Sequence, residues 1–503
     1  MTIQLAAPLL LPFLAAALAM LAWRWVAVQR WLGVAGAVGQ LAAGIVLLVT
    51  VRSEGVVVTQ IGNWPAPFGI TLVADLLSAG MVVITGLMGL AVVVFSFGGL
   101  DNRRESFGYY PLLLILLVGI GGAFLTGDIF NLFVWFEVML IASFVLLALG
   151  GERAQLVGAL KYVTINLVSS AFFLAAVGIL YGLTGTLNMA DLSERLRDLD
   201  APVLETTVAM LLLVVFGIKA AVFPLFFWLP ASYHTPPVVV SAIFAGLLTK
   251  VGVYALIRTF TLLFVGDVGF THTLLLVVAG LTMVIGAIGA VTQQDLRRVF
   301  SFLVISAVGY MVMGLGLFTA FALGAALFYM VQDVLAKTAL FLVSGLVRLV
   351  GGSFSLARLG GLYRTNPVLA GLFLLPALSV AGIPPMSGFA AKVGLVQAGL
   401  EGEQYLVVGL ALVASVVTLL AVAVAWGEAF WKSAPEGASI DLAEYRATSR
   451  GERLSMFAPV AVLVALVVVL GLAAQPVLEL ALEAGDQLMA PDAYLDAVLG
   501  ADR

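Results

Sequence analysis

The sequence predicts an all-α polytopic membrane protein with about fourteen transmembrane helices. Of its 503 residues, 62% are hydrophobic and only 10% are charged. Apolar runs of about 20 residues recur from end to end, and a run of that length crosses a bilayer as a helix. The 53 glycines suit close helix packing in lipid. The expected spans are residues 3–22, 31–50, 72–98, 110–126, 129–150, 155–183, 202–228, 238–262, 271–292, 297–317, 321–348, 366–400, 404–430 and 455–474.

The composition also excludes several classes of function. The chain has no cysteine, which excludes disulfides, thiolate metal sites and cysteine nucleophiles. Its two histidines, His234 and His272, are too few for a histidine-built metal centre. There is no cofactor motif or nucleophile constellation, and a net charge of −4 gives no indication of a nucleic-acid partner. We therefore expect no cofactor, no nucleic acid and no covalent catalysis.

The remaining segments carry patterns of their own. Residues 3–22 lack a basic n-region and exceed a signal-peptide core, so they are interpreted as the first span. Residues 51–71 combine β-branched residues with glycines and predict a small extramembrane hairpin. Residues 187–198 have the pattern of an amphipathic interfacial helix. Residues 432–453 are the longest polar loop, and the tail after residue 475 is expected along the surface.

The basic residues predict the orientation in the membrane. With both termini outside, the cytoplasmic loops contain Arg24, Arg30, Arg103, Arg104, Arg153, Arg297, Arg298, Arg348, Arg358, Arg364, Lys432, Arg446, Arg450 and Arg453. The outer side then contains Arg52, Arg195, Arg197, Arg258 and Arg503. Fourteen against five is a clear positive-inside bias. We therefore expect both termini outside.

The other five basic residues are all lysines inside predicted spans. They are Lys161, Lys219, Lys250, Lys337 and Lys392, whereas the nineteen in loops or near span ends comprise eighteen arginines and one lysine. A buried lysine can release its proton, but arginine stays charged. Ionisable groups in hydrocarbon cost about 2.5–3.5 kcal/mol each on insertion scales. Keeping this set inside the membrane therefore favours proton transport over simple structure.

A weak internal repeat and two interrupted spans support a transporter. Residues 128–133 resemble residues 295–300, an offset of 295 − 128 = 167, and further matches follow at that offset. Because five spans separate the copies, they are expected to be inverted, as in many secondary transporters. Pro224 interrupts the seventh span, and Pro384 and Pro385 interrupt the twelfth. Such breaks are tolerated only beside protein or water, and simple packing kinks are the alternative.

In the first half, the candidate proton-translocating residues are Glu137, Lys219 and Lys250. The carboxylate of Glu137 can stabilise the ammonium of Lys219, and Lys250 can receive the proton next. Glu137 could equally be a structural acid satisfied by serine or backbone. His234, just after the first break, is a candidate relay toward the cytoplasm, although a lone loop histidine is often ordinary surface.

In the second half, Asp333 and Lys337 are one helical turn apart and can pair locally. Lys392, after the second break, is the candidate outlet. Lys161 is either part of the path or an anchor at the interface. Asp75 and Asp128, at outer ends of spans, are weaker candidates.

Five motifs together resemble the antiporter-like subunits shared by respiratory complex I and Mrp-type Na⁺/H⁺ antiporters. They are residues 127–139, Ala159-Leu-Lys-Tyr162, residues 219–230, Leu248-Thr-Lys-Val-Gly-Val-Tyr254 and Gly382-Ile-Pro-Pro-Met-Ser-Gly-Phe389. The match covers about residues 70 to 430, and chain length and the Asp333–Lys337 spacing are similar to the D-type Mrp subunits.

The resemblance implies two inverted five-helix repeats with broken seventh and twelfth helices. The chain then divides into a three-helix segment with the hairpin, two proton half-channels, and a last part with a loop, one span and the tail: residues 1–109, 110–262, 271–430 and 431–503. It also implies proton translocation through five residues, Glu137, Lys219, Lys250, Lys337 and Lys392. The implied partners are other subunits of a hetero-oligomeric complex in the inner membrane of a bacterial cell, with Na⁺ as the second ion. Relatives often carry histidine where this chain has Gln332.

Several functions remain as alternatives at this point. The first is a proton-conducting subunit of a multisubunit Na⁺/H⁺ antiporter, a transporter rather than an enzyme. The second is the homologous proton-pumping subunit of a respiratory NADH:quinone oxidoreductase or membrane-bound hydrogenase. A stand-alone carrier of an organic solute would need a wider polar site than five lysines provide. A non-conducting scaffold does not explain lysines confined to the spans.

Overall fold

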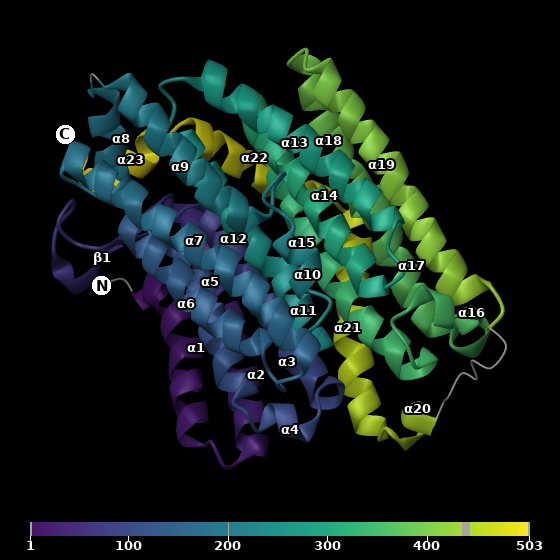
Figure 1. Cartoon of the computed structure of the whole chain (residues 1–503). Coiled ribbons are helices and arrows are strands. Elements are labelled where there is room, and N and C mark those ends of the chain that lie inside the picture. The colour runs from purple at the N-terminus through teal and green to yellow at the C-terminus, as the bar shows by residue number, and fades with distance from the viewer. Residues whose placement is uncertain (1–2, 200, 435–442, 501–503) are drawn as a thin grey trace.

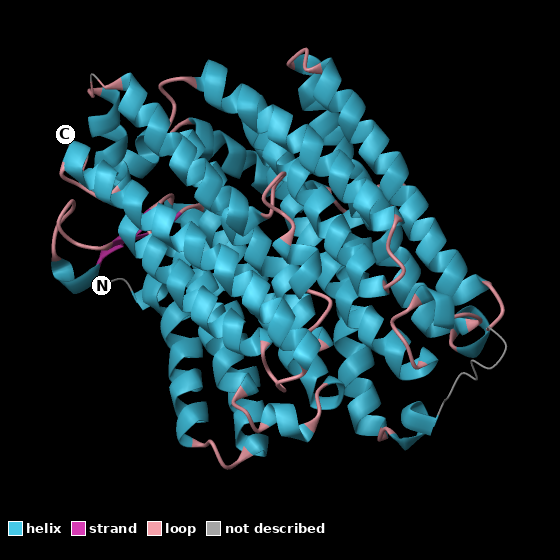
Figure 2. Cartoon of the chain, viewed as in Figure 1, coloured by secondary structure: helices cyan, strands magenta, loops and turns pink. Residues whose placement is uncertain are grey.

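The computed structural model of the chain describes residues 3–199, 201–434 and 443–500. Figures 1 and 2 show a bundle of tilted helices with one short two-stranded sheet at one end. In these ranges, twelve helices are long and apolar enough to cross a membrane, and the apolar helices Tyr109–Leu125 and Pro367–Ala381 are shorter. Together they correspond to the fourteen predicted spans, which confirms the all-α polytopic fold.

The elements follow in chain order. The first part contains α1 (Ile3–Leu21), α2 (Val26–Glu54), β1 (Val57–Gln60), β2 (Thr71–Ala74), α3 (Leu76–Gly99), α4 (Asn102–Glu105), α5 (Tyr109–Leu125), α6 (Ile129–Leu147), α7 (Arg153–Thr184), α8 (Met189–Arg197), α9 (Pro202–Ala220), α10 (Trp228–Ser232), α11 (Val238–Ile243) and α12 (Thr249–Leu262). The second part contains α13 (Val268–Val291), α14 (Leu296–Leu317), α15 (Ala320–Gly351), α16 (Leu362–Thr365), α17 (Pro367–Ala381), α18 (Ser387–Glu401), α19 (Tyr405–Trp426), α20 (Ala443–Ala447), α21 (Arg450–Leu472), α22 (Gln475–Met489) and α23 (Asp492–Leu499).

The predicted hairpin is present but lies slightly later in the chain. Strands β1 and β2 pair antiparallel, with Val57 opposite Ala74. The third span was expected from residue 72, and α3 instead begins at Leu76. The cause is a capping box, in which Asp75 accepts from Ser78 N and Ser78 Oγ accepts from Asp75 N, both at 2.9 Å. The helix predicted at 187–198 is present as α8, and its position at the membrane interface stays a prediction.

The tail folds back onto the bundle. Figure 1 shows α22 running from the top of α21 toward α23, which lies near α8 at the other side of the molecule. Gly485 of α22 and Gly324 of α15 let the two backbones meet, because a Cβ on Gly485 would lie 2.8 Å from Gly324 N. The expected surface position of the tail is therefore only partly right. Of the predicted polar loop 432–453, residues 435–442 lie outside the described residues.

Two spans are interrupted, as predicted. Helix α9 ends at Ala220 and the chain becomes helical again at Trp228, and α17 ends at Ala381 before α18 begins at Ser387. Proline lacks an amide donor, and other helices satisfy the groups freed nearby. At the first break, Phe223 N donates to Thr282 Oγ1 at 2.9 Å. At the second, Ser415 Oγ donates to Ala381 O at 3.1 Å.

The offset of 167 residues is visible in the structure. Helix α7 spans 153–184 and α15 spans 320–351, and both bounds differ by 167. Short antiparallel bridges join Asp128 to Asn188 and Asp295 to Ser355, again at that offset. Each of the two aspartates also caps the helix that follows it. The two segments thus share local architecture, and the inversion of one half relative to the other stays a prediction.

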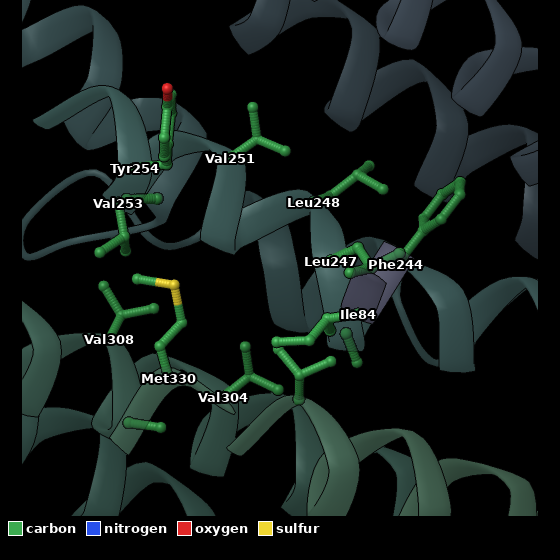
Figure 3. Close-up of a cluster of buried hydrophobic side chains, with 14 of the residues drawn as sticks. Ile84, Phe244, Leu247, Leu248, Val251, Val253, Tyr254, Val304, Val308 and Met330 are labelled. Atoms are coloured by element: carbon green, nitrogen blue, oxygen red, sulfur yellow. The ribbon is translucent and has the colours of Figure 1, made fainter. Parts of the chain in front are cut away.

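The centre of the bundle is apolar and fully enclosed. The span at 238–262, which includes α11 and α12, is entirely buried. In α7, by contrast, only about a third of the residues in its most apolar 18-residue stretch are buried. Figure 3 shows Leu247 of the span at 238–262 beside Ile84 of α3, and Val253 of the same span pointing toward Val308 of α14 and Met330 of α15. Any charge placed in this region is removed from both water and lipid.

Candidate functional site

Three ionisable side chains meet in this enclosed centre. Lys250 Nζ of α12 lies 2.7 Å from Asp333 Oδ2 of α15, and Lys337 Nζ lies 3.9 Å from Asp333 Oδ1. All three side chains are 0% exposed. The i,i+4 pairing of Asp333 with Lys337 was expected from the sequence, but the shorter contact to Lys250 comes from another helix. We call these three residues the central cluster.

Local distortion of the helix positions Lys250. Residues Phe244–Leu248 form a π-helical turn, and Lys250 Nζ donates to Ala245 O at 3.0 Å. Such turns leave carbonyl groups free and occur often at functional sites. Gly246 lies in this turn, and a Cβ there would be 2.3 Å from Thr338 Oγ1 of α15. Glycine therefore permits the close approach that brings Lys250 to Asp333.

Glu137 and Lys219, the predicted pair of the first half, have separate partners. Glu137 of α6 accepts a hydrogen bond from Ser170 Oγ of α7. Lys219 Nζ of α9 lies 5.5 Å from the centroid of the Phe136 ring. In the described part of the chain no ion pair joins Glu137 directly to Lys219, although the two charges interact over a longer distance. Glu137 thus bonds Ser170, and Lys219 lies over the Phe136 ring, in place of the direct contact that was expected between Glu137 and Lys219.

A small cavity lies beside Lys219. It measures about 20 Å³ and is lined by Lys219, Asn166, Tyr162, Leu248 and residues of α6 and α12. That volume holds about one water molecule. Gly252 of α12 makes the helices meet here, since a Cβ would lie 2.4 Å from Ala220 N. The cavity lies between Lys219 and the helix that carries Lys250.

Lys392 is held by the second helix break. Its Nζ donates to Val380 O and Ala381 O at 3.1 Å each and to Ser415 Oγ at 2.9 Å. The ammonium also lies 4.9 Å from the centroid of the Tyr310 ring. The two carbonyls are free because α17 ends at Ala381. The break therefore supplies the acceptors that a buried ammonium requires.

The other predicted residues lie away from the central cluster, Lys219 and Lys392. Lys161 is exposed on α7, outside the bundle centre. His234 is half-buried in the loop after α10, and its Nδ1 donates to Pro230 O at 2.8 Å. Burial, followed by the positive charge of Arg298, lowers the pKa of His234 below its ordinary value. Neither residue contacts the central cluster.

Arg258, which the sequence places on the outer side of the membrane, forms a buried ion pair. Its side chain is buried on α12, and its Nη2 lies 2.5 Å from Asp75 Oδ2. A Tyr494 ring from α23 covers the guanidinium at 5.2 Å. The sequence places Asp75 at the outer end of a span and Arg258 on the same side of the membrane, but it does not predict that the two pair. Asp128 caps α6 by accepting from Asn131 N at 2.7 Å, and burial raises the pKa of its carboxyl to about 6.

Several polar residues of the site were missed. Ser170, Ser379 and Ser415 each bond a candidate residue or Gln332. The repeat could have identified Ser170, and also Asn166 beside the cavity, because each lies 167 residues before a charged residue of the central cluster. Asn166 and Ser170 on α7 therefore correspond to Asp333 and Lys337 on α15.

The arrangement is suited to proton movement. Glu137, Lys219, the central cluster and Lys392 lie on helices from both halves. Within the described ranges, no group of three or more histidine, aspartate or glutamate side chains could hold a metal ion. One carboxylate balances one ammonium, so the central cluster is neutral with one protonated lysine and carries one extra charge with two. A single proton separates those states.

The chain is similar to known membrane proteins over almost its whole length. Residues 126–418 match the model of the NADH:quinone oxidoreductase/Mrp antiporter transmembrane family. The D-type subunit of the Na(+)/H(+) antiporter of Alkalihalophilus pseudofirmus is 43% identical over 98% of both chains. A chain in the structure of the Mrp complex from Dietzia sp. is 32% identical, with a TM-score of 0.90 over 99% of this chain and 100% of that chain.

A second solved structure is similar over the same length. A chain of the membrane-bound sulfane sulfur reductase, an archaeal respiratory membrane complex, is 25% identical, with a TM-score of 0.87 over 98% of this chain and 99% of that chain. The family model covers more than half of this chain, and the chain matches its relatives over almost their whole length. The chain therefore belongs to the NADH:quinone oxidoreductase/Mrp antiporter family of transmembrane subunits.

Proposed function

We propose that this chain is a proton-translocating subunit of a multisubunit Na⁺/H⁺ antiporter in a bacterial cell membrane. It works as part of a secondary transporter and carries out no covalent chemistry. The observation that carries the proposal is the central cluster, in which two lysines share one carboxylate at zero exposure. A scaffold has no need of such a group, because a buried ion set is costly and often no more stable than apolar packing.

Protons move in this proposal between Glu137 and Lys219 in one half, the central cluster, and Lys392 in the other. The groups line up on α6, α9, α12, α15 and α18, and each carries one proton at a time. Internal water fills the gap beside Lys219, where the cavity has room for about one molecule. The two halves act as inverted half-channels, and both termini lie outside, in line with the bias of the basic loops.

The position of Glu137 supports assembly with other subunits. Glu137 is partly exposed in the isolated chain, and Phe130, Val134 and Ile141 on the same face of α6 are 41%, 38% and 65% exposed. These residues are spaced at 130, 134, 137 and 141, which is one helix face. A carboxylate on a lipid-facing surface is costly, so a neighbouring subunit covers this face.

A second candidate function has its own support. A subunit of a respiratory NADH:quinone oxidoreductase or hydrogenase would use the same residues, and the family description and the respiratory structural relative favour it. The greater identity to the antiporter subunit, over almost the whole chain, favours the first proposal.

Expression with and without its operon partners distinguishes these functions. In a strain lacking its own antiporters, everted vesicles with the complete complex should show Na⁺-dependent proton exchange, and vesicles with this chain alone should not. Robust exchange by the chain alone would contradict the proposal and favour a stand-alone carrier. Co-purification with iron–sulfur and quinone-site subunits would favour the respiratory function.

A further inference from the structure

Unpartnered polar atoms concentrate around the central cluster. Among the described residues, buried side-chain atoms without a hydrogen-bond partner include Thr249 Oγ1, Gln332 Nε2 and Thr338 Oγ1. Thr249 adjoins Lys250 in the sequence, and the other two adjoin Asp333 and Lys337. Buried polar groups are nearly always bonded to protein or to internal water. These atoms therefore indicate where water is held.

Gln332 is the member of this group with a defined orientation. Its side chain is fully buried on α15, and its Oε1 accepts from Ser379 Oγ at 3.2 Å. Ser379 Oγ in turn accepts from Gly388 N at 3.1 Å and lies 3.0 Å from Ser387 Oγ. A carbonyl oxygen only accepts, so the Ser379 hydroxyl is the donor in this contact. The amide nitrogen, with two donors, faces elsewhere and has no protein partner among the described residues.

The same helix break holds Lys392. Ser379 directly precedes Val380 and Ala381, whose carbonyls accept from Lys392 Nζ. The break is tight, because a Cβ on Gly388 would lie 1.8 Å from Ser379 O and 3.3 Å from Gln332 Oε1. Lys392 also interacts electrostatically with Lys337 and Asp333. Gln332 thus lies at the contact between the central cluster on α15 and the lysine on α18.

We propose that Gln332 is a positioning residue whose amide, oriented by Ser379 and Ser387, holds an internal water between the central cluster and Lys392. The water accepts a proton from the Lys337 ammonium while it gives a different proton to the neutral amine of Lys392. Only N–H and O–H bonds exchange, and one unit of charge moves. Gln332 itself keeps its protons throughout. This inference rests on the proposed function, because it concerns a step between two of its residues.

The test uses the complete complex in everted vesicles, with exchange rate, solvent isotope effect and assembly on native gels as readouts. Gln332→Leu should lower the rate at least tenfold at normal assembly, since leucine cannot hold the water. Gln332→His should restore most of the rate, because an imidazole N–H can donate in place of the amide. Ser379→Ala should fall in between and raise the solvent isotope effect, and the double variant should be no slower than Gln332→Leu, since the two act as a unit.

Gln40→Leu is the matched control. Gln40 is also fully buried, donates from Nε2 to Leu117 O at 3.1 Å and has one unpartnered atom, but lies on α2. It should keep near-normal exchange. A rate within twofold of the unmodified complex for Gln332→Leu, or an equal loss for Gln40→Leu, would overturn the inference. If Gln332→Leu fails to assemble, normal exchange and isotope effect in Ser379→Ala would overturn it.

One further variant separates the two proposals. Lys392→Met should abolish exchange if Lys392 carries protons. If Lys392→Met and Gln332→Leu both exchange normally, the proposed function fails with the inference. If only Lys392→Met abolishes exchange, the inference alone is wrong.

Discussion

Helices α7 and α15 have the same length and correspond at an offset of 167 residues, but they lie in different surroundings. In the most apolar 18-residue stretch of each helix, about a third of the residues of α7 are buried, compared with 83% of those of α15. At corresponding positions α7 carries Asn166 and Ser170, and α15 carries Asp333 and Lys337. The polar positions are thus kept in both copies, but ionised groups occupy them only in the enclosed helix. The comparison teaches that burial by neighbouring helices decides where charge is retained.

The largest expected effect separates the two equivalent positions 333 and 166. Asp333→Ala should remove the shared carboxylate and leave the buried lysine charge without a counter-ion, which lowers the free energy of unfolding by about 3–5 kcal/mol. Asn166→Ala removes only a bond to Tyr162 O at 2.8 Å within α7, worth about 1 kcal/mol. Thermal unfolding of the purified complexes measures both. Equal losses would break the comparison between α7 and α15.

A second prediction compares the serines that hold the ionised groups. Ser170→Ala removes the side-chain donor that bonds Glu137 and should lower exchange about tenfold, since bonds to charged groups contribute about 1.5–3 kcal/mol. Ser415→Ala leaves Lys392 its two carbonyl acceptors and should lower exchange only a few-fold. Initial rates in everted vesicles test the pair. A greater loss with Ser415→Ala would show that the carbonyls of the second break do not hold the ammonium.

His234 should make the complex sensitive to acid. Burial and Arg298 favour the neutral imidazole, so the folded pKa lies below the unfolded value of about 6.5. The folded state then binds fewer protons than the unfolded state, and stability present above that value is lost as pH falls through it. His234→Gln should flatten the decline of the melting temperature between about pH 7.5 and 5.5. An unchanged slope would contradict this assignment.

The smallest effect is expected at Lys161. Its side chain is exposed on α7 and far from the enclosed centre, so Lys161→Gln should keep more than half of the exchange rate. Loss of exchange with normal assembly would place Lys161 in the path and extend the functional groups of α7 to its outer face.

The sequence predicted the spans, both breaks and the hairpin because hydrophobic length, proline and β-branched residues act locally. It also predicted the i,i+4 contact of Asp333 with Lys337. The shorter Lys250–Asp333 contact depends on a π-helical turn and on Gly246, which no period in the sequence reveals. The Arg258–Asp75 ion pair was not predicted for a related reason: the two residues lie 183 positions apart, and only tertiary packing brings them together.

The central claim, that buried lysines carry protons, is tested most directly at Lys219. Lys219→Arg keeps a positive charge near Glu137 and over the Phe136 ring, but arginine cannot release its proton. Lys219 is partly exposed to the neighbouring cavity, which leaves room for the larger side chain. The measurement is Na⁺-dependent proton exchange in everted vesicles, normalised to the amount of assembled complex. Proton carriage predicts complete loss of exchange at normal assembly, and near-normal exchange would contradict it.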